Sequence, residues 1–297
     1  MKNKSHLLFY NAYEDFYTMA SHSQAFQEFC KDAFGEDFSQ DGFSDIKQIQ
    51  RILQYIPVGN RTHGEGVENT GNVGSEVHTT DIGCNNVKSG VHILNSGYYN
   101  AKSEAHILDI GCGNGKMLGY LQKATGAYIH GFDYSEQAIK TARELFPANS
   151  EFTVGVVGEI DYAEAQFDVI TSMDTMYFAK DMSAFVAQVK RWLKPDGIFF
   201  VGYQEGDVIP KTESAETTLL TKAIKQNGMK YEALDITGHT YDLLKRKREC
   251  AVARQAEFEA EGNKSWFDML MFQTECATVP YEEFREKMAR YIYVVRK

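Results

Sequence analysis

Three glycines at alternating positions, directly after a short apolar run, constrain the fold of this chain more than any other feature. The run covers residues 106–110, and Gly111, Gly113 and Gly115 follow it. An apolar, β-prone run of this length predicts a parallel strand that is buried on both faces. Glycine permits positive φ and removes the Cβ atom, so a ligand can lie against the main chain. Residues 116–125 predict a helix, whose N-terminus attracts polar or anionic groups.

The glycine spacing and two carboxylates indicate the kind of ligand. A dinucleotide-binding turn follows the pattern G-x-G-x-x-G, but the third glycine position holds Lys116 here. Asp109, two residues before the first glycine, would repel a pyrophosphate and attract an ammonium group. Asp133, at the end of the next apolar run, is placed to accept both hydroxyls of a ribose. This pattern favours a nucleoside cofactor that has an amine and no phosphate, as S-adenosylmethionine (SAM) does.

Four segments, in the same order, resemble the class I SAM-dependent methyltransferases over about residues 107–203. They are Leu108-Asp109-Ile110-Gly111-Cys112-Gly113-Asn114-Gly115, Gly131-Phe132-Asp133, Phe167-Asp168-Val169-Ile170 and Leu193-Lys194-Pro195-Asp196-Gly197-Ile198-Phe199-Phe200. The last segment departs from the family pattern, since Asp196 stands where glycine is commoner. The alternative is a Rossmann-like domain that binds another nucleoside ligand.

The resemblance implies SAM as the cofactor, S-adenosylhomocysteine (SAH) as the product, and no metal. It implies contacts with the methionyl amine, the ribose and the adenine, the last from a residue after the third strand. The cofactor-binding residues expected on this basis are Asp109, Gly111, Cys112, Gly113, Gly115, Asp133, Tyr134, Glu159, Ile160, Ser172 and Met173. Glu159 stands where the family commonly has aspartate, and Asp161 competes with it for that role.

Several aromatic residues are candidates for binding the methyl acceptor. They are Tyr13, Tyr17, Tyr177, Tyr203 and Trp266. Each has a second interpretation: Tyr13 and Tyr17 either close the cofactor cleft or form a helix packing stripe. Trp266 belongs to an apolar cluster, residues 266–272, that forms either the core of a cap or a pocket lining.

Catalysis of methyl transfer needs few special side chains. The reaction is an in-line displacement in which the protein positions the partners and excludes water. A base helps only where the acceptor must first lose a proton. Tyr177 is one weak candidate, as an orienting group or an aromatic lid, and His239 is another, as a base or an ordinary surface residue.

Composition narrows the partners. The formal net charge of -10 weighs against DNA, RNA and anionic membranes. The five cysteines form no C-x-x-C pair, which suits reduced thiols and predicts a cytoplasmic location without structural zinc. We expect no signal peptide, because residues 1–9 lack a long apolar run, and no membrane span.

Alternating strands and helices along the chain predict parallel βαβ units, and the resemblance implies a seven-stranded, Rossmann-like α/β methyltransferase sheet with its last strand antiparallel. The predicted parts are an N-terminal helical lid (1–57), a Gly/Asn-rich insertion (58–105), the core (106–238 and 290–297) and a helical cap (239–289) between strands six and seven. The expected strands cover residues 106–110, 128–133, 151–157, 167–173, 198–204, 231–237 and 291–295. The expected helices cover residues 11–33, 45–56, 116–125, 136–146, 182–193, 212–227, 241–261 and 281–289.

The insertion carries a degenerate 14-residue repeat. Copies begin at Gly64, His78, His92 and His106, and only the last keeps the full glycine pattern. The segment is either a silent insertion or a duplicated strand and turn without a cofactor site of its own. A loop of this length is otherwise unusual in a compact domain.

The sequence thus predicts a SAM-dependent methyltransferase that acts on a small molecule. The alternatives are a protein or nucleic-acid methyltransferase and a non-catalytic SAM-binding protein. Residues 172–177 lack the Asn/Asp-Pro-Pro-Tyr signature of exocyclic base methylation. The sequence identifies neither the acceptor atom nor the oligomeric state, since fold does not fix function.

Overall fold

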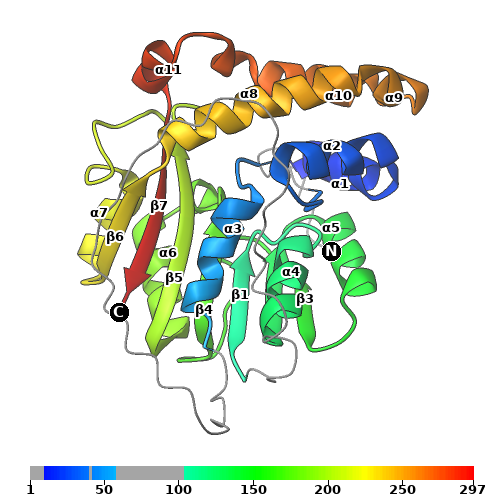
Figure 1. The fold of residues 1–297 in the computed structure, drawn as a ribbon. Helices are drawn as coiled ribbons and strands as arrows, with labels where there is room; N and C mark the ends of the chain where they lie inside the picture. The colour runs from blue at the N-terminus through cyan, green and yellow to red at the C-terminus, as the bar shows by residue number, and fades with distance from the viewer. Residues whose placement is uncertain (1–9, 40–41, 58–103) are drawn as a thin grey trace, which may run out of the picture.

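The computed structural model describes residues 10–39, 42–57 and 104–297. The repeat copies in residues 64–103 lie outside these residues. The described chain forms one sheet flanked by helices, with more helices across one end of the strands, as Figure 1 shows.

The sheet has seven strands in the order β3-β2-β1-β4-β5-β7-β6. The strands are β1 (His106–Ile110), β2 (Tyr128–Asp133), β3 (Ser150–Val154), β4 (Phe167–Met173), β5 (Leu193–Glu205), β6 (Lys230–Asp235) and β7 (Ala289–Arg296). Strands β1 to β5 pair in parallel, whereas β7 runs antiparallel to both β5 and β6. The predicted fold class, including the antiparallel last strand, is confirmed.

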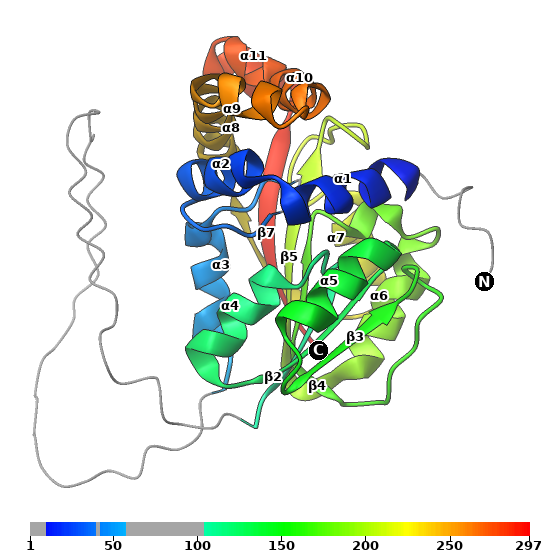
Figure 2. The ribbon, with the colours of Figure 1, turned by 90° about the vertical axis from the view of Figure 1, so that its right-hand side faces the viewer.

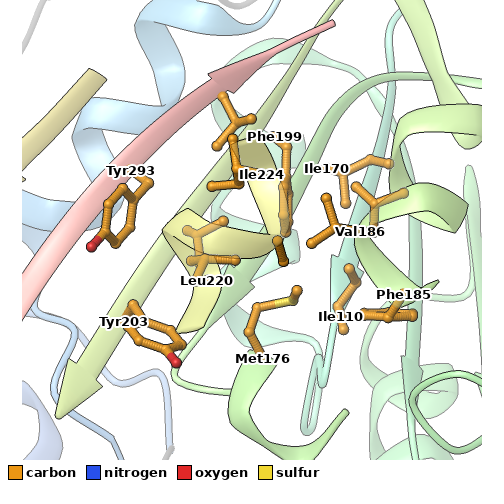
Figure 3. Packing of buried hydrophobic residues seen from close by; sticks show 14 of the residues in the cluster. Ile110, Ile170, Met176, Phe185, Val186, Phe199, Tyr203, Leu220, Ile224 and Tyr293 are labelled. Atoms are coloured by element: carbon orange, nitrogen blue, oxygen red, sulfur yellow. The ribbon is translucent and has the colours of Figure 1, made fainter. Parts of the chain in front are cut away.

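Helices cover both faces of the sheet. Helices α3 (Ile46–Ile52), α4 (Lys116–Thr125) and α5 (Glu136–Leu145) pack on one face, where Ile107, Ile129 and Leu118 are fully buried. Helices α6 (Met182–Trp192) and α7 (Leu219–Gln226) pack on the other, against residues such as Ile170 and Phe199, which Figure 3 shows. Burial of both faces explains why the central strands are continuous apolar runs.

The turn between β1 and α4 holds the glycines in conformations that other residues rarely adopt. The φ angles of Gly111, Gly113 and Gly115 are 74°, 52° and 75°. The backbone N–H groups of Gly111 and Cys112 both donate to the carbonyl of Phe132 on β2. The turn is therefore fixed to the end of the neighbouring strand, at the carboxyl edge where α/β sheets bind ligands.

The remaining helices form a layer over the carboxyl ends of the parallel strands. The N-terminal pair is α1 (Tyr10–His22) and α2 (Gln24–Phe34); the cap between β6 and β7 comprises α8 (Thr237–Ala253), α9 (Gln255–Ala260), α10 (Lys264–Gln273), the 3-10 turn η3 (Glu275–Thr278) and α11 (Tyr281–Lys287). Figure 2 shows α1 and α2 between the cap and the sheet. Arg254 of the cap pairs with Asp32 of α2 at 2.7 Å, and Arg246 donates to the carbonyl of Ala33 at 2.6 Å. These contacts join the two helical parts.

Some element boundaries differ from the prediction. Residues 212–218, expected in a helix, instead form a turn in which Thr212 donates to the Glu205 carboxylate and Thr217 to the carbonyl of Ser214. Thr218 then caps α7. Strand β5 begins five residues early, because a register shift lets Leu193 pair with Phe167 before Ile198 pairs with Val169. The expected helix over 45–56 ends at Ile52 and continues as a 3-10 turn, Leu53–Tyr55.

Candidate functional site

A cavity of about 1110 Å³ lies between the carboxyl ends of the strands, helix α1 and the cap. Single-ligand pockets commonly hold ~300–1,000 Å³, so this cavity lies just above the upper end of that range. One end is lined by the glycine turn and the ends of β1 and β2, and the other by the ends of β4 and β5 and by α10, η3 and α11.

The Asp133 carboxylate organises the first end. Its Oδ2 accepts from the N–H of Gly113 at 3.0 Å, and its Oδ1 accepts from the N–H of Ser135 at 2.9 Å. The side chain lines the cavity but is only 6% exposed. A Cβ atom on Gly113 would stand 2.4 Å from the Tyr17 hydroxyl, so α1 closes directly over the turn. The site therefore needs glycine at position 113.

Asp109 lies beneath the same end of the cavity in an environment that favours its neutral form. Burial raises the pKa of its carboxyl group to about 8; the hydrogen bond from Thr171 opposes the shift, and the nearby Asp133 charge adds to it. The Thr171 hydroxyl donates to Oδ1 at 2.7 Å. A cation placed beside this carboxyl group would draw it into the charged form.

Aromatic side chains wall this end of the cavity. Tyr134, directly after β2, has its ring edge-on to Tyr10 and Tyr13, with centroids 5.6 and 6.0 Å apart. Tyr13 stacks on Tyr17 at 6.3 Å. A flat, uncharged ring system such as a nucleobase fits a wall of this kind.

A buried ion pair forms part of the second end. Arg290 of β7 donates from Nη1 to both carboxylate oxygens of Asp174, at 2.6 and 2.7 Å, and the two side chains are 1% and 8% exposed. Its Nη2 donates to Ser44 at 3.0 Å and to Gln48 at 3.3 Å. The pair therefore joins the end of β4, the last strand and the segment before α3.

Most of the predicted site residues lie on the cavity wall. Those that line it are Asp109, Gly111, Cys112, Gly113, Asp133, Tyr134, Met173, Tyr13, Tyr17, Tyr177 and Trp266. Burial raises the pKa of the Tyr177 phenol well above its ordinary value, so this side chain stays protonated and can donate a hydrogen bond. It is not suited to act as a base near neutral pH.

Six predicted residues lie elsewhere, and two of them were proposed to touch the acceptor or take its proton. His239 is half-buried on α8 and bonds to the buried Asp45 at 3.0 Å. Tyr203 points into the core, where Figure 3 shows it near Met176 and Leu220. Alternation along β5 explains this, since the side chain of Gln204 takes the opposite face.

The other four were predicted to hold the cofactor. Ser172 is fully buried, and Glu159 is exposed in a turn. A Cβ atom on Gly155 would meet Ile160, whose side chain packs beside the strand end. Gly115 faces Phe152 and Ala142, so its lack of a side chain serves helix packing.

Sequence reasoning missed Asp174, Gln204 and Arg290. Asp174 directly follows the parallel strand β4, and Gln204 lies at the end of β5. Because α/β sheets bind ligands at the carboxyl ends of their strands, these two positions could have been recognised from the sequence. Arg290 begins an antiparallel strand after the cap, and only the folded chain brings it to Asp174.

The described residues contain neither a membrane-spanning helix nor a metal-binding cluster. None of their helices combines the length and apolarity that a membrane span requires. Within the same residues, no three His, Cys, Asp or Glu side chains gather in a way that could hold a metal ion.

Known proteins similar to this chain agree with the fold. A family described as a methyltransferase domain matches residues 108–201. A ubiquinone biosynthesis O-methyltransferase of Thiobacillus denitrificans is 37% identical over 91 residues, which cover 29% of this chain and 39% of that protein. One of Neisseria meningitidis is 34% identical over 79 residues, covering 25% and 33%. The chain thus spans well under half the length of the curated relatives it matches.

Two solved structures share nearly the whole fold. Phosphoethanolamine N-methyltransferase 2 of Haemonchus contortus, in complex with SAM, has a TM-score of 0.65 at 16% identity, over 98% of this chain and 60% of that one. A cyclopropane synthase of Mycobacterium tuberculosis has a TM-score of 0.62 at 14% identity, over 96% and 98%. The strand order and the glycine turn are those of the class I SAM-dependent methyltransferase fold, and the match to a methyltransferase domain lies within it, at residues 108–201.

Proposed function

We propose that this protein transfers a methyl group from SAM to a small-molecule acceptor. One observation carries the proposal: a single cavity joins the glycine turn to a second end built from β4, β5 and the cap. A cofactor at the first end and an acceptor at the second would meet beside Met173 and Asp174, between the strand ends and the helices that line the cavity. Exclusion of water and alignment of the two partners are what methyl transfer requires.

The residues at the first end suit SAM. When bound, SAM supplies an electrophilic methyl group on a sulfonium centre. The backbone at Gly111 and Gly113 offers close approach, Asp133 offers a carboxylate to ribose hydroxyls, and the ring of Tyr134 offers a face to adenine. Asp109 would hold the methionyl amine, either directly or through water.

The second end orients the acceptor. Asp174 is neutralised by Arg290, so neither group is a free charge for the acceptor to bind. Tyr177 stays a neutral phenol that donates a hydrogen bond. On this view neither Asp174 nor Tyr177 takes a proton from the acceptor before transfer.

A small acceptor is favoured over a polymer. The cap and α1 cover the cavity, and the net charge of -10 opposes nucleic acid. The relatives named ubiquinone biosynthesis O-methyltransferases support a small molecule as well. Among the described residues, Cys112, Cys250 and Cys276 form no disulfide, which accords with the proposed cytoplasmic location.

Calorimetry with SAH tests the cofactor half of the proposal. We expect micromolar binding to the wild type and a loss of roughly 100-fold in Asp133→Ala, which removes charge-assisted hydrogen bonds. Asp168→Ala is the matched control, because Asp168 also accepts from a backbone N–H, that of His106, but lies at the other end of the sheet. Wild-type protein that does not bind SAH would exclude the proposal.

Transfer itself is tested with radiolabelled SAM and a cell extract separated into metabolites, proteins and nucleic acids. Label in the metabolite fraction supports a small acceptor. Label confined to protein or nucleic acid would favour those alternatives. SAH binding without label in any fraction would favour a non-catalytic binding protein.

A further inference from the structure

Gln204 lies in the second end of the cavity and has a buried polar atom that the described part of the fold leaves unpaired. Its side chain lines the cavity and is 4% exposed, and its Oε1 has no hydrogen-bond partner among the described residues. Burying an unpaired amide oxygen costs about 1–3 kcal/mol. Folded proteins leave few such groups, and a functional role is one explanation for those that persist.

The position of Gln204 matches that of an acceptor molecule. It pairs across the sheet with Arg290, and antiparallel partners place their side chains on the same face. Two residues earlier, Gly202 pairs with Met173 at the end of β4. Gln204 therefore lies one strand beyond β4, on the side of the cavity away from the glycine turn.

The surroundings of Gln204 define what it can hold. The wall of the second end includes the aromatic rings of Phe43, Tyr177 and Phe178, which suit a flat or apolar body. A carbonyl oxygen accepts hydrogen bonds and repels carboxylate and phosphate oxygens. The Gln204 Oε1 atom therefore suits a ligand that carries an O–H or N–H donor.

We propose that Gln204 is the specificity-determining residue for the acceptor, which it orients by accepting a hydrogen bond from a hydroxyl or amine group. This inference rests on the function proposed above. Tyr177 donates and Gln204 accepts, so the two side chains together suit a group that does both, as a hydroxyl or an amine does. An acceptor without such a donor leaves the buried oxygen unpaired and loses affinity.

The test uses protein loaded with SAH and two matched pairs of aromatic probes, with affinities measured by NMR titration. Catechol is compared with 1,2-dimethoxybenzene, and benzylamine with trimethylbenzylammonium. Each pair keeps the ring and, in the second case, the charge, but only one member has a hydrogen-bond donor. We expect about tenfold preference for the donor in one pair. Preference in the first pair identifies a hydroxyl acceptor, and preference in the second an amine.

Variants assign the preference to Gln204. Gln204→Met keeps the length of the side chain without the amide; it should abolish the preference, leave SAH affinity unchanged, and raise the melting temperature by ~2–4 °C because the unpaired oxygen is gone. Tyr203→Phe is the matched control. It removes the neighbouring Oη, which is also buried but belongs to the core and not to the cavity wall. It should keep the preference.

Three outcomes would overturn the proposal. One is an equal response to both members of each pair, no response included. Another is a Gln204→Met protein that keeps the wild-type preference for the probe with a hydrogen-bond donor. The third is a melting temperature that falls by several degrees in Gln204→Met, which would show a structural hydrogen bond. A wild-type protein that does not bind SAH is a separate result, which rejects the proposed function itself.

Discussion

The two ends of the cavity are built in contrasting ways. The end at β1 and β2 comes mainly from one stretch of chain, residues 109–134, and relies on backbone groups held by Asp133. The end at β4 and β5 comes from segments far apart in sequence, which the Asp174–Arg290 pair joins to Ser44. A contiguous motif can bind one constant ligand, whereas an end assembled from several segments can differ between relatives that act on different acceptors.

The largest expected effect is on stability, and it follows from disrupting the ion pair at the second end of the cavity. Arg290→Met leaves the Asp174 carboxylate buried without its partner, so we expect a loss of ~3–5 kcal/mol in the free energy of unfolding, measured with urea. The double variant with Asp174→Asn should recover part of this loss, because asparagine tolerates the φ of 61° at that position.

SAH binding sharpens this result. At a temperature where Arg290→Met is folded, its SAH affinity should match the wild type, since Arg290 does not line the cavity. An Arg290→Met protein within ~1 kcal/mol of wild-type stability would contradict the structural role of the ion pair.

A smaller effect, on SAH affinity, is expected from a substitution at the first end of the cavity. Gly113→Ala places a methyl group 2.4 Å from the Tyr17 hydroxyl at a φ of 52°, and we expect SAH binding to weaken by ~10–100-fold in calorimetry. Gly158→Ala is the matched control, because Gly158 has a φ of 85° and no atom within 4 Å of an added Cβ.

Combining Gly113→Ala with Tyr17→Phe separates steric overlap from backbone strain. The double variant should regain part of the lost affinity, since the hydroxyl is the nearest atom to the new methyl group. Equal losses of SAH affinity in Gly113→Ala and Gly158→Ala would argue against the close approach of α1 to the turn.

The smallest effect concerns a proton. The pKa of Asp109 is raised to about 8, so this group is mostly protonated at pH 6.5 in the free protein. A bound amine favours the carboxylate, so binding of SAH should release a proton. SAH affinity should then rise with pH by up to about tenfold per unit below pH 8, and level off above it.

Calorimetry at pH 6.5 in two buffers with different ionisation enthalpies measures this release directly. The apparent binding enthalpy should differ between the buffers for the wild type and agree for Asp109→Asn. The same enthalpy in both buffers for the wild type would show that Asp109 does not change its protonation on binding.

The local sequence pattern predicted the strands and helices of much of the core correctly. The boundaries of β1, β2, β4 and α4 were predicted to the residue, because each is a short apolar or amphipathic run with a clear breaker at its end. The prediction failed over residues 212–218, where threonine and serine side chains bond to the backbone and compete with helix. His239, a candidate base on the sequence alone, lies outside the cavity lining and bonds to Asp45.

The sequence by itself determined the central strands, the glycine turn and the carboxylates beside it, because apolar runs and glycines at positive φ are properties of a few consecutive residues. Only the tertiary structure decided the second end of the cavity. Arg290 meets Asp174 there, Tyr203 turns into the core and Gln204 faces the cavity. These contacts join residues separated by tens to hundreds of positions, and no local pattern records which distant side chain will neutralise a charge or leave an oxygen unpaired.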